Sequence, residues 1–204
     1  MVREIAAHKR VIFNGNGYAP QWVEEAARRG LPNLRTTVDA LPCLLAEKNR
    51  TLFERHRVFT ETELRSRFEI GLEAYVKVLT IEAETALTMA RREILPAVMR
   101  YTGEIAAQAR DIKGYAPALN AMPQEKLLTA LTQGAARLSE DIDALQCAVD
   151  SRACAASMQD QAVYARDVIL RGLNALRESA DELETMVARD SWPIPTYAEL
   201  LFDV

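Results

Sequence analysis

The turn Asn14-Gly15-Asn16-Gly17 is the stretch of this sequence whose residue types first suggest chemistry. It follows the apolar run 11–13 and precedes a helix that we expect to begin at Pro20, an arrangement whose backbone amides can hold a phosphate. A dinucleotide fingerprint needs a third glycine where Pro20 stands, and no lysine followed by serine or threonine completes a P-loop. Asn-Gly is itself a strong turn signal, because both residues tolerate positive φ. We therefore expect a structural corner here and no cofactor-binding residue.

The cysteines and histidines form no pattern that suits a metal. His8 and His56 lie far apart, and Cys43, Cys147 and Cys154 make no CxxC pair, whereas a zinc site needs ligands at short spacings. Cys147 and Cys154 are seven positions apart and would share one face of a helix, so we interpret them as buried, reduced thiols and not as a redox pair. No metal-binding residue is assigned.

Carboxylates and serines offer no acid–base or nucleophilic arrangement. Glu24 with Glu25, and Glu82 with Glu84, are one or two positions apart and do not share a helical face, so solvated surfaces are the better interpretation. Serines in predicted helices lack a histidine nearby in the sequence, which leaves a Ser-His triad without support; they are Ser139, Ser151 and Ser157. No catalytic residue is assigned within residues 1–204.

The composition is that of an ordinary globular protein with helical character. The 204 residues are 49% hydrophobic, 26% charged and 6% aromatic, and the net charge is −4 with a pI of about 5.4. This charge argues against a nucleic-acid partner, because phosphate binding needs clustered cations. The sequence has no signal peptide and no apolar run near the ~18 residues of a membrane span, so we expect no membrane partner and a cytoplasmic location.

Two regions that differ in their glycine and proline content must position these residues. Glycines and prolines break residues 1–59 into short pieces, which we interpret as a connecting segment of strand, Asn-Gly turn and short helices. Residues 60–204 have long helical periods. Thr60 and Glu63 form a predicted capping box, and apolar or small residues then recur with a mean step near the ~3.6 residues of an α-helix. We predict one continuous helix from about Glu61 to Ala109, kinked by Pro96.

Two further long helices follow, each with an apolar seam whose steps alternate between three and four, as in coiled-coil packing. The seam residues are Leu128, Leu131, Ala135, Leu138, Ile142, Leu145 and Val149, then Ile169, Leu173, Leu176, Ala180, Leu183 and Val187. The predicted fold is all-α, a long antiparallel bundle of about three long helices after a short strand-turn-helix segment. A second capping box, Thr196 with Glu199, begins a tail whose Trp192 and Tyr197 are expected to dock.

Four stretches of the sequence carry a resemblance to a known family. They are HKRVIFNGNGYAPQWVEEAARRGLPNLRTTVDALP (8–42), LFERHRVFTETELRSRFE (52–69), ARREILPAVMRY (90–101) and WPIPTYAELLF (192–202). In this order they resemble the region that follows the catalytic domain of type III glutamine synthetases, over nearly the whole chain. The resemblance implies a parent enzyme that ligates ammonia to glutamate with ATP and Mg²⁺ or Mn²⁺, through a γ-glutamyl phosphate. The family's catalytic motifs lie upstream, and none is carried over to residues 1–204.

Our expectation is a noncatalytic C-terminal helical region that serves architecture, assembly or regulation. The resemblance implies two kinds of partner, the chain's own upstream catalytic domain and neighbouring subunits of a large homo-oligomer. The chain alone is expected to be inactive and to hold no cofactor. The alternative is a free-standing helical scaffold that binds other proteins. Residues 1–42 favour the first interpretation, since an adaptor has no need of a segment that resembles a severed connection. A regulatory ligand between the helices is a third possibility, which no residue supports.

Overall fold

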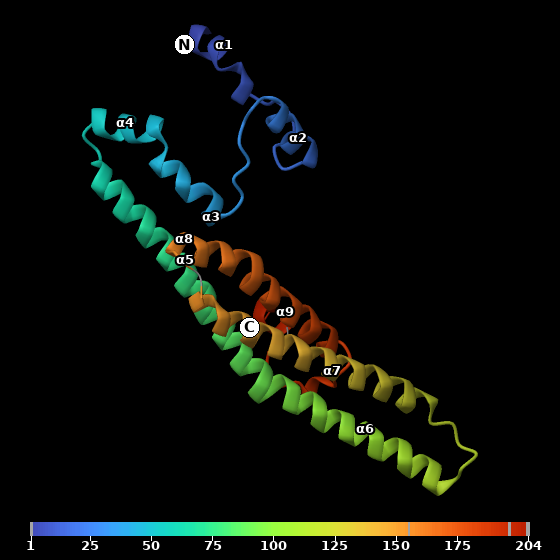
Figure 1. Ribbon diagram of the computed structural model, residues 1–204. Helices are drawn as coiled ribbons and strands as arrows, with labels where there is room; N and C mark the ends of the chain where they lie inside the picture. Colours follow the sequence, from blue (N-terminus) through green and yellow to red (C-terminus); the bar gives the residue numbers. More distant parts are fainter. Residues whose placement is uncertain (1, 155, 196, 203–204) are drawn as a thin grey trace. The chain divides into compact units, whose positions relative to one another are not determined.

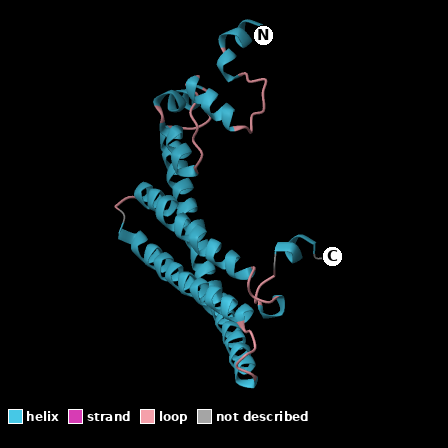
Figure 2. Cartoon of the chain, turned by 90° about the vertical axis from the view of Figure 1, so that its right-hand side faces the viewer, coloured by secondary structure: helices cyan, strands magenta, loops and turns pink. Residues whose placement is uncertain are grey.

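The computed structural model describes residues 2–154, 156–195 and 197–202 (Figure 1). All regular structure in this described part is helical, and none of it is strand (Figure 2), so the all-α class is confirmed. Contacts divide the chain into two compact units, residues 1–68 and residues 69–204, which are described separately. The sequence-based division between residues 59 and 60 stays a prediction. No helix among the described residues is long and apolar enough to cross a membrane.

The first unit consists of short helices. They are α1 (Val2–Ala7), α2 (Pro20–Arg28), α3 (Thr37–Ala40) and α4 (Glu47–Arg55), with 3₁₀ turns at Lys9–Val11 and Leu41–Leu45. The predicted strand at its start is wrong. Val11 ends a 3₁₀ turn and residues 12–14 have no regular structure. A lone strand has no ladder to join, and the carbonyl of Ile12 instead accepts a hydrogen bond from the Arg29 side chain.

The capping box that begins the long helix α5 (Glu61–Met89) is confirmed. The backbone N–H of Glu63 donates to Thr60 Oγ1 at 3.3 Å, and the backbone N–H of Thr60 donates to Glu63 Oε2 at 2.7 Å. Each residue thus satisfies a backbone donor of the other, as donors at the start of a helix require. The second expected box begins at Thr196, which lies outside the described residues.

The helix predicted through Pro96 is also confirmed as continuous. A π-helical turn (Ala90–Ile94) joins α5 directly to α6 (Leu95–Tyr115), with no extended break. Pro96 has no N–H to donate, and its ring would crowd the carbonyl of Arg92 in a regular α-helix. The π turn changes the spacing at this point, because the N–H of Leu95 donates to the carbonyl of Ala90, five residues back. The proline is thereby accommodated inside the helix.

Two more helical runs complete the second unit. The first is α7 (Met122–Ser151); the second is α8 (Met158–Tyr164), a π turn (Ala165–Ile169) and α9 (Leu170–Glu184). Helix α7 packs along both α6 and α9 (Figure 1). The chain has more helical elements than the three expected. The additional ones arise from the two π turns, a 3₁₀ turn at Arg152–Cys154 and the short terminal helix α10 (Tyr197–Phe202).

The core of the second unit follows the predicted seams in large part. In α7, in the run that ends with α9 and just after it, the seam residues that lie buried are Leu131, Leu138, Ile142, Leu145, Val149, Ile169, Leu176, Leu183 and Val187. The tail is docked at Trp192, which is only 5% exposed. The 3₁₀ turn Arg189–Ser191 that precedes it lies against α6. That part of the docking prediction is confirmed, whereas the side chain of Tyr197 lies outside the described residues.

Candidate functional site

The Asn-Gly turn is a corner built around two aromatic rings. Phe13 and Trp22 stack with their ring centroids 4.4 Å apart and an angle of 25° between the rings. Gly15 lies under Phe13, so closely that a Cβ added to Gly15 would be 2.5 Å from Phe13 Cζ. Positive φ is not the reason for the glycine, because the described residues with positive φ are Gly30 and Arg57. The close packing of the Phe13 ring explains Gly15.

Arg29 fixes this corner from the end of α2. Its Nη1 donates to the carbonyl of Ile12 at 2.8 Å and to that of Arg10 at 3.3 Å, and its Nε donates to Glu25 Oε1 at 2.6 Å. The hydrogen bond from Arg29, with the nearby charges of Arg28 and Arg29, lowers the pKa of Glu25. The Arg29 guanidinium therefore binds the chain's own backbone and a carboxylate, as a structural clamp does.

The cysteine interpretation is corrected in two respects. Cys43, Cys147 and Cys154 are all free thiols and all exposed, so the expected burial is wrong. Cys147 and Cys154 do not share a helical face, because α7 ends at Ser151 and Cys154 belongs to a 3₁₀ turn. Within the described part of the chain, no group of three or more His, Cys, Asp or Glu residues is placed to hold a metal ion.

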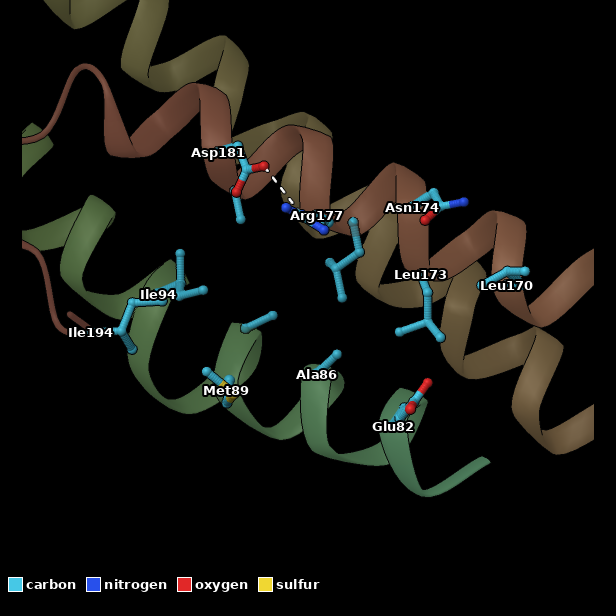
Figure 3. Close-up of a pocket in the computed structure, with 13 residues that line it drawn as sticks. Glu82, Ala86, Met89, Ile94, Leu170, Leu173, Asn174, Arg177, Asp181 and Ile194 are labelled. Atoms are coloured by element: carbon cyan, nitrogen blue, oxygen red, sulfur yellow. Dashed lines mark hydrogen bonds and ion pairs between the residues drawn. The ribbon is translucent and has the colours of Figure 1, made fainter. Parts of the chain in front are cut away.

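The carboxylate pair Glu82 and Glu84 is separated by the fold, and one of its members reaches a groove. Glu82 lines an open groove between α5 and α9, and Glu84 lines a different depression, together with Arg91 and Gln146. The groove has a volume of about 380 Å³ and lies wholly within the second unit (Figure 3). This open groove between two helices of one unit is the candidate binding site of the chain.

Both walls of the groove are largely apolar. One wall is formed by α5 and the π turn after it, the other by α9, and Ile194 from the tail lies at one end (Figure 3). The apolar residues that line it are Ala86, Met89, Ala90, Ile94, Leu170, Leu173, Leu176, Ala180 and Ile194. Such a lining favours binding through removal of apolar surface from water.

Few polar groups border the groove. They are Glu82 on α5, and Asn174, Arg177 and Asp181 on α9. Arg177 Nε lies 3.4 Å from Asp181 Oδ2, one turn further along the same helix (Figure 3). The described residues that line the groove include no serine, cysteine or histidine, the residue types of a nucleophile and its base.

Sequence reasoning missed this groove although parts of it were visible. Leu173, Leu176 and Ala180 are predicted seam residues of one helix, and the recurring apolar or small residues of another include Ala86 and Ala90. A periodic pattern marks the apolar face of a helix but does not say which residues of that face a neighbouring helix covers. Glu82, assigned to a solvated face, is exposed but stands at the edge of the apolar lining.

Comparisons with known proteins agree on one family. The model of the glutamine synthetase C-terminal domain matches residues 1–113. A glutamine synthetase of Butyrivibrio fibrisolvens is 33% identical over 98% of this chain and 29% of its own length. The type-3 glutamine synthetase of Dictyostelium discoideum is 32% identical over 96% and 27%, and a glutamine synthetase of Bacteroides fragilis is 27% identical over 97% and 28%. The chain thus spans less than a third of the length of these relatives.

Proposed function

The chain belongs to the family of glutamine synthetase C-terminal domains, and on that premise we propose that it serves as the noncatalytic helical region of a type III glutamine synthetase. The family match over residues 1–113, with alignment to the relatives over nearly the whole chain, is the observation that carries this proposal. The relatives are more than three times as long as the matched region. Most of their polypeptide, and in our proposal the catalytic machinery, lies outside it.

The parent enzyme, in this proposal, ligates ammonia to glutamate with ATP through a γ-glutamyl phosphate. Mg²⁺ or Mn²⁺ neutralises the phosphates, and the residues that hold nucleotide and metal belong to the upstream region. The contacts of the acidic side chains in the first unit fit this division. Glu25 is paired with Arg28 and Arg29, and Glu61 with Arg50 and Arg65. These carboxylates stabilise the local fold, which suits a structural role.

The region contributes architecture and assembly. We propose that α5 with α6, α7, and α8 with α9 act as an antiparallel bundle of about three long helices that packs on the upstream catalytic domain and on neighbouring subunits of a cytoplasmic homo-oligomer. Packing of α7 along both α6 and α9 supports this. A stiff bundle of long helices suits a spacer or contact element, because its core residues hold the helices in one arrangement.

Deletion of residues 60–204 from the full-length enzyme tests the assembly role. Light scattering coupled to size exclusion measures the mass of the particles. We expect the full-length enzyme to form a large oligomer and the deletion variant to form smaller particles that melt at a lower temperature. Particles of unchanged mass and melting temperature would contradict a role in assembly.

The alternative function is a free-standing helical scaffold for other proteins. The groove between α5 and α9 is the observation that favours it, since an apolar surface of this kind is suited to a helical partner. Reading the gene upstream of the codon for Met1 separates the two functions. A catalytic domain encoded in the same frame supports the glutamine synthetase assignment, whereas an upstream stop codon supports the scaffold.

A further inference from the structure

The groove between α5 and α9 is a seam between two helices that leaves room for another helix. The two walls run beside one another and are joined from behind by α7, which packs on α9 and contacts the π turn that continues α5 (Figure 3). Small, partly exposed side chains stand on both walls, Ala86 on one and Ala180 on the other. Alanines at such a seam let a further helix approach closely, because helix separation is set by the side chains at the contact.

The length of the groove also suits a helix. Its wall runs from Glu82 to Ile94, which at ~1.5 Å per residue corresponds to about 18 Å, or three turns. The apolar surface continues beyond it, because Val78 lies one turn before Glu82 on the same side of α5 and is 53% exposed. A row of apolar side chains spaced three and four positions apart on an incoming helix would cover this surface.

The charge of the groove specifies the incoming helix further. Glu82 makes no hydrogen bond or ion pair within the described part of the chain, while Arg177 and Asp181 neutralise one another. The second unit as a whole is acidic as well, since residues 69–204 contain 13 Lys and Arg against 21 Asp and Glu. A basic residue on the incoming helix would therefore complement Glu82.

We propose that this groove receives an amphipathic helix from the upstream part of the same glutamine synthetase polypeptide, with large apolar side chains against Ala86 and Ala180 and a Lys or Arg beside Glu82. The inference rests on the proposed function and names the partner surface of that region. The source follows from length, since the matched relatives hold more than two thirds of their polypeptide outside the region that this chain covers. In the proposed function that remainder packs against its C-terminal region, and the groove is an uncovered apolar surface fit for it.

Thiol labelling tests whether the groove is covered. Ala180→Cys places a thiol on the groove wall, and Ala136→Cys, on an exposed position of α7 that does not line the groove, is the matched control. Each variant is labelled with a maleimide as residues 1–204 alone and in the full-length enzyme. Mass mapping of peptides separates the new thiol from the three exposed natural cysteines. We expect labelling at position 180 to be about tenfold or more slower in the full-length enzyme, because the rate follows the fraction of open grooves, and labelling at position 136 to be unchanged.

Charge reversal tests the basic partner. Glu82→Lys in the full-length Ala180→Cys enzyme should restore most of the labelling rate, whereas Glu84→Lys, on a different face of α5, should not. Equal labelling at position 180 in both forms of the protein would overturn the proposal. In residues 1–204 alone, labelling at position 180 that slows as the protein concentration rises would assign the groove to a second copy of the chain. That result would also overturn the proposal. Either failure leaves the assembly test by deletion of residues 60–204 unaffected, so the two proposals fail separately.

Discussion

The ring of Phe13 occupies the space that a side chain on Gly15 would need. A Cβ at Gly15 would lie 2.5 Å from Cζ and 2.8 Å from Cε1 of Phe13. Movement of the ring away from this space would disturb its stack with Trp22, whose centroid lies 4.4 Å away. The Asn-Gly corner, which in the sequence suggests a phosphate loop, thus depends on its glycine for packing.

Gly15→Ala should therefore destabilise the corner. Overpacking of this kind typically costs about 1–3 kcal/mol of unfolding free energy, and thermal melting followed by tryptophan fluorescence, which reports on Trp22 and Trp192, measures it. Gly17→Ala is the matched control, because a Cβ there meets nothing within 4 Å. Equal melting temperatures for the two variants would show that the Phe13 ring yields freely.

Gly134 and Gly103 give a second matched pair, both within long helices. A Cβ at Gly134 would lie 2.7 Å from Leu183 Cδ2, a fully buried side chain on α9, whereas a Cβ at Gly103 meets nothing within 4 Å. We expect Gly103→Ala to stabilise the protein by about 0.5–1 kcal/mol through helix propensity. Gly134→Ala should lower stability instead, since α7 and α9 must move apart. Chemical denaturation followed by circular dichroism tests both, and stabilisation by Gly134→Ala would contradict the close packing.

The long helix and its start could be predicted because local signals agree there. The capping box of Thr60 and Glu63 needs only residues three positions apart, and an apolar period sustained through Pro96 outweighs one missing donor. The same reasoning identified the buried seam of α7, from Leu131 to Val149. In each case neighbours within the same helix determine the result.

Features that depend on distant partners could not be predicted in this way. The strand expected at residues 11–13 had the right local pattern but no strand to pair with, and Arg29 bonds its carbonyls instead. Cys147 is expected to be buried because thiols commonly are, yet it lies on the exposed side of α7. The groove could not be predicted either, because only the arrangement of α5 and α9 shows which part of each apolar face stays uncovered.

The docked tail predicts a stability effect at Trp192. Trp192→Ala should lower the unfolding free energy by about 3–5 kcal/mol, because it removes a large side chain from a buried position. Deletion of residues 191–204 should lower the melting temperature as well. Tyr115→Ala serves as the control, because Tyr115 is 88% exposed. A Trp192→Ala variant that melts like the Tyr115→Ala variant would mean that the tail does not stabilise the second unit.

Acid should weaken the start of α5. The hydrogen bond from Arg65, with that from Arg50, lowers the pKa of Glu61, and the backbone N–H of Thr60, with its hydroxyl, lowers the pKa of Glu63. A carboxylate whose pKa is lower in the folded state stabilises fully above its ordinary value of 4.5, and this stabilisation is lost as pH falls through the folded pKa. The melting temperature should therefore fall as the pH is lowered below 4.5.

The variant Glu63→Gln isolates one part of this effect. Glutamine keeps an acceptor for the Thr60 N–H but does not titrate, so its melting temperature should be lower than that of the wild type near neutral pH and should fall less steeply in acid. A variant with the same pH dependence as the wild type would show that Glu63 contributes nothing to it.

Titration calorimetry with ATP tests the noncatalytic assignment most directly. Phosphoryl transfer needs metal-holding carboxylates and cations that converge on the phosphates, and we assign these groups to the upstream part of the polypeptide. Residues 1–204 should therefore give no binding heat with ATP and Mg²⁺ or Mn²⁺ and should form no glutamine from glutamate and ammonia. The full-length enzyme, measured beside it, should bind ATP and form glutamine. Stoichiometric ATP binding by residues 1–204 would contradict the assignment and return the turn at Asn14–Gly17 to consideration as a phosphate site.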